Sequence, residues 1–159
     1  RGRNGSGKSS FLKLVTGEWK PTTGTLSRAD VPMAMLDQHV SLLPRGETLL
    51  SAMLHHNPGM TEHEAHAALA RFAFRNSDAL RLPETMSGGE RMRAGLAMVM
   101  SGPNPPQLLI LDEPTNHLDI DTIETLEAAL ATFSGALLVV SHDERFLEAI
   151  GCEHVLSLR

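Results

Sequence analysis

The chain has 159 residues, of which 42% are hydrophobic and 21% charged, and its formal net charge is −5. These values fit one ordinary globular domain and exclude a global basic field that would draw the chain onto nucleic acid. No apolar run approaches the roughly 20 residues that span a bilayer, and a single cysteine excludes an internal disulfide, so we expect a cytoplasmic protein that does not insert into a membrane.

A glycine-rich stretch near the start of the chain has the spacing Gly2-x-x-x-x-Gly7-Lys8-Ser9. This spacing is typical of a loop whose backbone N–H groups surround phosphate oxygens, with a lysine for the β- and γ-phosphates and a hydroxyl ligand for Mg²⁺. A glycine-rich turn without a ligand is the alternative. The predicted phosphate-binding residues are Gly2, Asn4, Gly5, Ser6, Gly7, Lys8, Ser9 and Ser10.

A helix is predicted from about Lys8 to Thr16, because Gly17 stops it, and its N-terminus would favour an anion. A phosphate loop normally follows a strand, so we expect the chain to be truncated at its N-terminus. Short strands are predicted near Thr25–Ser27 and Met33–Leu36.

Helical patterns predominate between about residues 39 and 101. A helix is predicted over Thr48–His55, and Thr61 with Glu64 forms a capping box that starts another. The segment Ser87-Gly88-Gly89-Glu90 starts a third helix, which runs to about Met100. We expect a single domain over residues 1–159, with a helical subdomain at about 39–101 inserted in an α/β core.

Strands and helices then alternate to the end of the chain. The predicted strands are Gln107–Leu111, Ala136–Val140 and His154–Leu158, and the predicted helices are Asp121–Thr132 and Glu144–Ile150. Apolar strands that are separated by helices predict a mostly parallel sheet covered by helices on both faces.

Two acids, Asp112 and Glu113, follow the first of these apolar strands. Ligands collect beyond the carboxyl ends of parallel strands. Asp112 is therefore suited to hold Mg²⁺ through water, and Glu113 to polarise the water that attacks a γ-phosphate. The alternative is that both acids only solvate the end of a strand.

Further motifs occur in a fixed order along the chain: Gln38 after a strand, Met86–Glu90 at a helix start, Pro114–Asp119 after the acids, and His142 after the next strand. With the phosphate loop, they resemble the nucleotide-binding domain of ATP-binding-cassette proteins, which is an α/β P-loop NTPase core. The segments Asp112–Asp119 and Ser141–Leu147 resemble the ABC-F branch, whose members act on ribosomes. The separation of Gln38 and Ser87 (87 − 38 = 49) favours the second of the two cassettes in such proteins.

The resemblance implies an ATPase that uses ATP and Mg²⁺, with Lys8, Gln38, Glu113 and His142 as catalytic residues. It also implies that the metal is held by Ser9, Gln38 and Asp112. The residues that reach the nucleotide of a facing cassette would be Ser87, Gly88, Gly89, Glu90 and Asp119. The implied partners are a second cassette, in the same polypeptide or in a dimer, and the ribosome with its rRNA. The isolated chain is expected to be incomplete, with weak ATPase activity or none.

Two other functions fit parts of the sequence. One is the ATP-binding subunit of a membrane transporter, whose partner would be a membrane permease. The other is a non-hydrolysing ATP-gated clamp similar to chromosome-maintenance cassettes, against which Glu113 argues.

Several further residues have two interpretations each. His63 and His66 are either metal ligands or part of a solvated helix face, and Arg91 and Arg93 either touch nucleotide or a partner or form surface salt bridges. Cys152 is expected to be a half-buried thiol. Three methionines are interpreted as core residues, with a partner-binding patch as the alternative; they are Met92, Met98 and Met100.

Overall fold

The structure is a computed structural model that describes residues 6–158. Its sheet has three parallel strands in the order β1-β2-β3, which are Met33–Leu36, Leu108–Asp112 and Ala136–Val140. Within the described part of the chain, the strands are therefore joined by crossovers that contain helices, as parallel pairing requires. The predicted parallel α/β core is confirmed.

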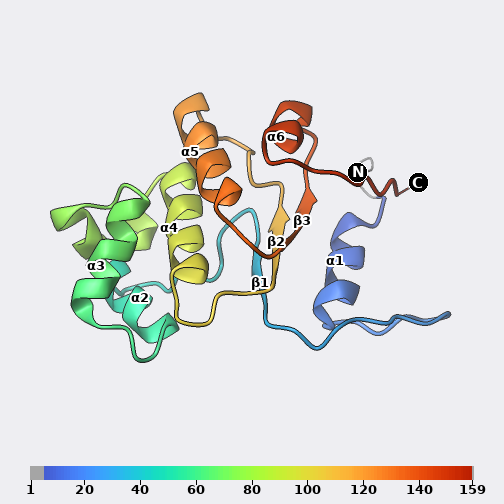
Figure 1. Cartoon of the computed structure of the whole chain (residues 1–159), viewed down its shortest axis with the longest axis horizontal. Coiled ribbons are helices and arrows are strands. Elements are labelled where there is room, and N and C mark those ends of the chain that lie inside the picture. Colours follow the sequence, from blue (N-terminus) through green and yellow to red (C-terminus); the bar gives the residue numbers. More distant parts are fainter. Residues whose placement is uncertain (1–5, 159) are drawn as a thin grey trace.

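Helices cover both faces of this sheet (Figure 1). Helix α1 (Lys8–Thr16) packs on one face, where Leu12 contacts Ile110 and Val140 in a small apolar cluster. The alternate residues of β2, Leu109 and Leu111, belong to the larger cluster on the other face. Side chains of successive strand residues point to opposite faces, so an uninterrupted apolar strand such as β2 fills both layers.

The larger cluster also contains the helices that separate β1 from β2. These are α2 (Leu49–His56), α3 (Glu62–Arg71) and α4 (Gly88–Met100), with two short 3-10 helices at Asn76–Leu80 and Pro83–Thr85. After β2 come α5 (Ile120–Ala131) and, beyond β3, α6 (Glu144–Ala149). The helical segment thus shares one continuous core with the sheet.

Local start and stop signals in the sequence account for the helix boundaries. Thr61 and Ser87 each cap a helix through a complete capping box, as predicted, and Asp119 caps α5. Gly17 ends α1 in the left-handed conformation, which glycine adopts without steric cost.

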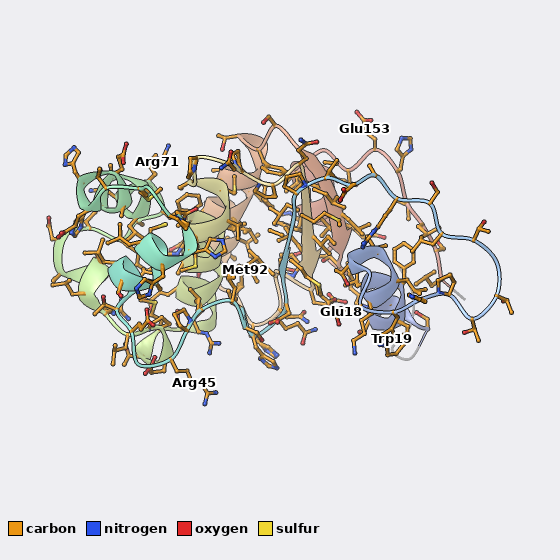
Figure 2. The ribbon with its side chains drawn as sticks, turned by 90° about the horizontal axis from the view of Figure 1, so that it is seen from below. Glu18, Trp19, Arg45, Arg71, Met92 and Glu153 are labelled. Carbon is orange, nitrogen blue, oxygen red and sulfur yellow. The ribbon has the colours of Figure 1, made fainter. Side chains whose placement is uncertain are left out.

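The methionines of α4 are core residues, as predicted: Met92 and Met98 are buried, and Met100 packs against the same cluster. Figure 2 shows Met92 inside the molecule, whereas Arg45 projects from its rim.

Two predicted strands do not form. Residues 25–27 and 154–158 have no strand assignment and are largely exposed. A strand is stabilised by pairing with a neighbour, and an apolar pattern alone supplies no neighbour. Cys152 is exposed rather than half-buried for the same reason, since the strand expected beside it is missing.

The helices of residues 6–158 are too short or too polar to cross a lipid bilayer.

Candidate functional site

The predicted phosphate and metal residues meet at the carboxyl ends of the strands. A cavity of about 370 Å³ is lined by Gly7, Lys8, Ser9, Ser10, Gln38, Asp112 and Glu113. Helix α1 contributes its first turn, Gln38 follows β1, and the two acids end β2. Tertiary folding therefore assembles one concave site from three separate parts of the sequence, at the edge where parallel α/β sheets bind ligands.

The first turn of α1 is shaped for an anion. Gly7 is the residue before the helix and has φ +90°, a conformation that favours glycine. The N–H groups of the first turn have no partners within the helix, and the helix dipole adds partial positive charge there. The Ser6 hydroxyl is buried without a hydrogen-bond partner among the residues that the structure describes. Gly2, Asn4 and Gly5, which we also predict to bind phosphate, lie outside the described residues.

Lys8, Glu113 and His142 contact one another. The Lys8 Nζ lies 3.4 Å from Glu113 Oε1 and 2.7 Å from His142 Nε2, and His142 Nε2 lies 3.3 Å from Glu113 Oε1. An ammonium group can only donate, so Lys8 donates to the Glu113 carboxylate and can donate to the imidazole of His142. The lysine therefore contacts both Glu113, the acid predicted to polarise water, and His142, the residue predicted to contact the γ-phosphate.

Glu113 is held in an unusual backbone conformation. Its φ is +50°, and its N–H donates to Val140 O at 2.7 Å, which fastens the residue to the end of β3. Only 7% of the residue is exposed. Left-handed backbone costs about 1 kcal/mol in a residue with a side chain and concentrates at functional sites. This turn directs the carboxylate toward Lys8 and His142.

The pKa of Asp112 is raised above its ordinary value. Burial is the main cause, and the negative charges of Glu113 and Asp37 add to it, while Lys8 opposes the shift. A cation bound by Asp112 would reduce the unfavourable effect of these two negative charges on its carboxylate. The electrostatics of this edge thus suit a divalent metal.

Asp37 is a site-shaping residue that sequence reasoning missed. Its carboxylate accepts hydrogen bonds from the N–H groups of His39 at 2.8 Å and Ser41 at 3.2 Å, and so forms the loop that carries Gln38. Burial raises the pKa of Asp37, but bonds from the Ser41 side chain and from both N–H groups outweigh burial and lower it. An aspartate directly after a strand and before a turn was the available signal.

The second group of predicted site residues lies apart from this cavity. Ser87, Gly88 and Gly89 begin α4, and Asp119 precedes α5. These helices lie across the sheet from α1 (Figure 1). A Cβ on Gly89 would stand 2.7 Å from Thr122 Cγ2, so glycine is needed for the start of α4 to approach α5.

Glu90, the last residue of this motif, is bound to an arginine that sequence reasoning did not single out. Arg81 Nη1 donates to Glu90 Oε1 at 2.5 Å and Nη2 to Oε2 at 3.1 Å, while Ser87 N donates to Oε2 at 2.8 Å. The bond from Arg81 is the main reason that the pKa of Glu90 falls to about 2, and burial opposes the shift. No local sequence signal connects residues 81 and 90, because the pairing depends on how the chain enters α4.

This pair gives the stability of the fold a defined pH dependence. The folded pKa of Glu90 is about 2 and the unfolded value 4.5, so its contribution is complete above 4.5 and is lost as pH falls toward 2. Allowing for partial exposure, the contribution is about 1–2 kcal/mol. We expect urea unfolding to show Glu90→Gln less stable than the unaltered chain at about pH 5.5, with a smaller gap at about pH 3.5. A difference in unfolding free energy that does not change with pH would contradict this role of the Arg81–Glu90 pair. The same pH dependence in Glu124→Gln, at an exposed position of α5, would also contradict it.

The remaining candidates make internal contacts. Arg91 Nη2 donates to His39 O, and the Arg93 guanidinium lies 5.4 Å from the centre of the Phe74 ring. Neither contact is a salt bridge, and a role of these arginines toward nucleotide or a partner stays a prediction. The described residues contain no group of three or more His, Cys, Asp or Glu side chains arranged to hold a metal ion, and His63 is exposed on α3.

The donor set of the cavity fits a magnesium–triphosphate. One hydroxyl, one amide and one carboxylate are available from Ser9, Gln38 and Asp112, all of which line it. Mg²⁺ takes oxygen ligands, and proteins commonly hold it with one or two carboxylates together with substrate phosphates. The buried Ser6 hydroxyl without a partner fits a phosphate oxygen.

Comparisons with known proteins agree with this geometry. The family model described as "ABC transporter" matches residues 1–116. The chain is 38% identical over 148 residues to ABC transporter F family member 3 of Arabidopsis thaliana, covering 92% of this chain and 20% of the relative. It is 38% identical to human ATP-binding cassette sub-family F member 3, covering 94% of this chain and 21% of that protein. The chain thus spans about a fifth of the length of these curated relatives.

Solved structures share the fold. A dimeric post-hydrolysis state of an ATP-binding cassette, bound to ADP and Pi, superposes with a TM-score of 0.73 at 23% identity over 93% of this chain and 75% of that one. A bacterial Atm1-family ABC exporter with ATP bound gives a TM-score of 0.75 at 19% identity over 92% of this chain and 29% of the exporter. The family match shows that this chain belongs to the ABC transporter family, and the curated relatives that it matches are members of sub-family F.

Proposed function

We propose that this chain binds ATP with Mg²⁺ and hydrolyses the bond between the β- and γ-phosphates. It would do so as one half of a head-to-tail pair of cassettes. The observation that carries the proposal is the cavity at the carboxyl edge of the sheet, which gathers phosphate-loop residues, Gln38 and both acids. Residues 1–159 would act as one nucleotide-binding domain, with a helical subdomain at about 39–101.

Each residue would have a distinct task. Lys8 and the N–H groups of the first turn of α1 would neutralise and orient the phosphates, and Ser9, Gln38 and Asp112 would hold Mg²⁺. Glu113 would position and polarise the attacking water, and His142 would contact the γ-phosphate. Bound Mg²⁺ supplies charge neutralisation on the phosphates.

The contacts of Lys8 indicate how ATP binding would change the surroundings of Glu113 and His142. Its ammonium group bridges Glu113 and His142. A bound γ-phosphate would compete for the same cation, so Glu113 and His142 would become available to the attacking water and to phosphate. Phosphoryl transfer passes through a loose transition state, and this arrangement acts by positioning and charge.

The second cassette is needed because one chain holds two unlike half-sites. The cavity lies at the carboxyl edge of the sheet and includes the first turn of α1, whereas α4 packs on the face opposite α1. Ser87, Gly88, Gly89 and Asp119 would face the nucleotide of the partner, in the same polypeptide or in a dimer. Pairing in ABC proteins, such as the dimeric cassette bound to ADP and Pi, supports this.

We further propose that the pair works on ribosomes in the cytoplasm, because the curated relatives at 38% identity belong to sub-family F.

Retention of radiolabelled ATP on a filter tests the core of the proposal. We expect retention by the chain to require Mg²⁺ and to be lost with EDTA, and absence of retention would refute it. Sucrose-gradient sedimentation of the protein expressed in cells tests the target. Comigration with ribosomes is expected, and recovery only with membranes would instead favour the transporter subunit.

A further inference from the structure

The start of α4 combines an anion site with a carboxylate, and the two are in electrostatic conflict. The proposed function requires Ser87, Gly88 and Gly89 to bind a γ-phosphate of the partner's nucleotide. Glu90 lies in the same first turn, with its carboxylate 2.8 Å from Ser87 N. A phosphate bound at this turn would carry the same sign of charge as the Glu90 carboxylate and would be repelled by it, most strongly where water is excluded.

Arg81 resolves this conflict in the structure. Its guanidinium group spans both oxygens of the Glu90 carboxylate, which is the bidentate geometry of a strong ion pair. The Glu90 side chain is 25% exposed and that of Arg81 is 35% exposed, so the pair is partly shielded from solvent. The guanidinium group therefore neutralises the carboxylate, including the Oε2 atom that also accepts from Ser87 N.

The backbone of Arg81 is also fixed. Its carbonyl oxygen accepts from Leu49 N, the first residue of α2, at 3.0 Å, and its own N–H donates to Asp78 O at 3.1 Å. The guanidinium thus extends from an anchored loop, and the start of α4 is tied through it to α2.

The hydrogen bonds of Glu90 also orient the hydroxyl group of Ser87. The Ser87 hydroxyl oxygen accepts from Glu90 N at 3.2 Å. A hydroxyl whose oxygen accepts one bond can direct its proton to a separate acceptor. In the described structure, both Glu90 oxygens are already engaged by Arg81 and Ser87 N.

We propose that Arg81 and Glu90 are positioning residues for the in-trans phosphate site, with Arg81 cancelling the Glu90 charge and Glu90 holding Ser87 in place. Glu90 then acts without touching the partner's nucleotide. This inference rests on the proposed function and adds a residue, Arg81, that no motif contains.

Sedimentation velocity of the chain with Mg²⁺ and a non-hydrolysable ATP analogue tests the proposal, with the analogue concentration at half-maximal pairing as the readout. Arg81→Met leaves Glu90 unpaired and is expected to raise this concentration about tenfold. Arg81→Lys keeps the charge and is expected to stay within about threefold. Arg45→Met is the control, because it also removes one arginine but at an exposed position (Figure 2). It is expected to leave the analogue concentration at half-maximal pairing unchanged.

The double variant Arg81→Met/Glu90→Gln separates charge from packing. It removes the uncompensated carboxylate while glutamine can retain the capping box, so pairing is expected to recover to within about threefold of the unaltered chain. An Arg81→Met variant that pairs normally, or a double variant that stays as impaired as the single, would overturn the proposal. If Arg81→Met does not fold, the double variant and Arg81→Lys test the proposal instead. Impaired pairing in both of these folded variants would overturn the proposal.

Filter retention of the analogue by each variant distinguishes this result from failure of the proposed function. The cavity at Lys8 does not include Arg81, so retention measured at protein concentrations too low for pairing is expected to be unchanged in every folded variant. If the unaltered chain retains no nucleotide, the proposed function fails. If it retains nucleotide and pairs, but pairing ignores Arg81, only the positioning role fails.

Discussion

Glu113→Gln is expected to lower ATP hydrolysis by about 10²–10⁴-fold, the range typical of a removed general base. Glutamine matches the size of the side chain but cannot accept the proton of an attacking water. The same backbone turn and the Val140 contact would hold it in place. Single-turnover assays with protein in excess over labelled ATP measure the loss even if turnover by the isolated chain is weak.

Binding and hydrolysis are expected to separate in this variant. Because the phosphate contacts of Lys8 and α1 remain, retention of ATP should stay within about threefold of the unaltered chain. Glu124→Gln, an exposed change on α5, serves as the control and is expected to hydrolyse normally. Phosphate release that survives Glu113→Gln would assign the base elsewhere. An unaltered chain that binds ATP but never releases phosphate would favour the non-hydrolysing clamp.

Lys8→Met is expected to weaken ATP binding by about 100-fold, because it removes a charge-assisted contact to phosphate. It also leaves the Glu113 carboxylate, whose side chain is 8% exposed, without its 3.4 Å cation. Removal of one partner of a buried pair costs about 3–5 kcal/mol, and partial exposure of Lys8 lowers this to about 1–3 kcal/mol. Equilibrium filter binding measures the first effect and urea unfolding the second.

Lys13→Met on the same helix is the matched control. The Lys13 ammonium group lies 4.8 Å from the centre of the Trp19 ring, away from the cavity lining. Its loss is expected to leave ATP binding unchanged. Equal weakening by Lys13→Met would mean that the general charge of α1, rather than a contact at the phosphate loop, governs binding.

Local patterns in the sequence were sufficient for most of the helices and for the strands that pair. The capping residues Thr61 and Ser87 mark helix starts because their side chains satisfy backbone N–H groups a few residues away, which is a purely local interaction. The run Ala136–Val140 forms the predicted strand because its apolar residues fit a position beside β2. The motif residues of the cavity are likewise predictable, since their spacing follows from the geometry of a strand or helix end.

The failures have a common cause. Residues 25–27 and 154–158 have strand-like composition, but a strand exists only where another strand supplies hydrogen-bond partners. Cys152, which we expected to be half-buried, is exposed. Local propensity therefore gave no information on whether an edge would be paired.

The sequence by itself determined the order of the motifs, the covered parallel core and the identity of the residues that line the cavity. Only the tertiary structure decided which of them touch. Lys8 meets Glu113 across 105 residues of chain and His142 across 134, and Arg81 reaches Glu90 through the direction in which the chain enters α4. These contacts depend on packing between distant elements, and no interaction within a short stretch of sequence encodes them.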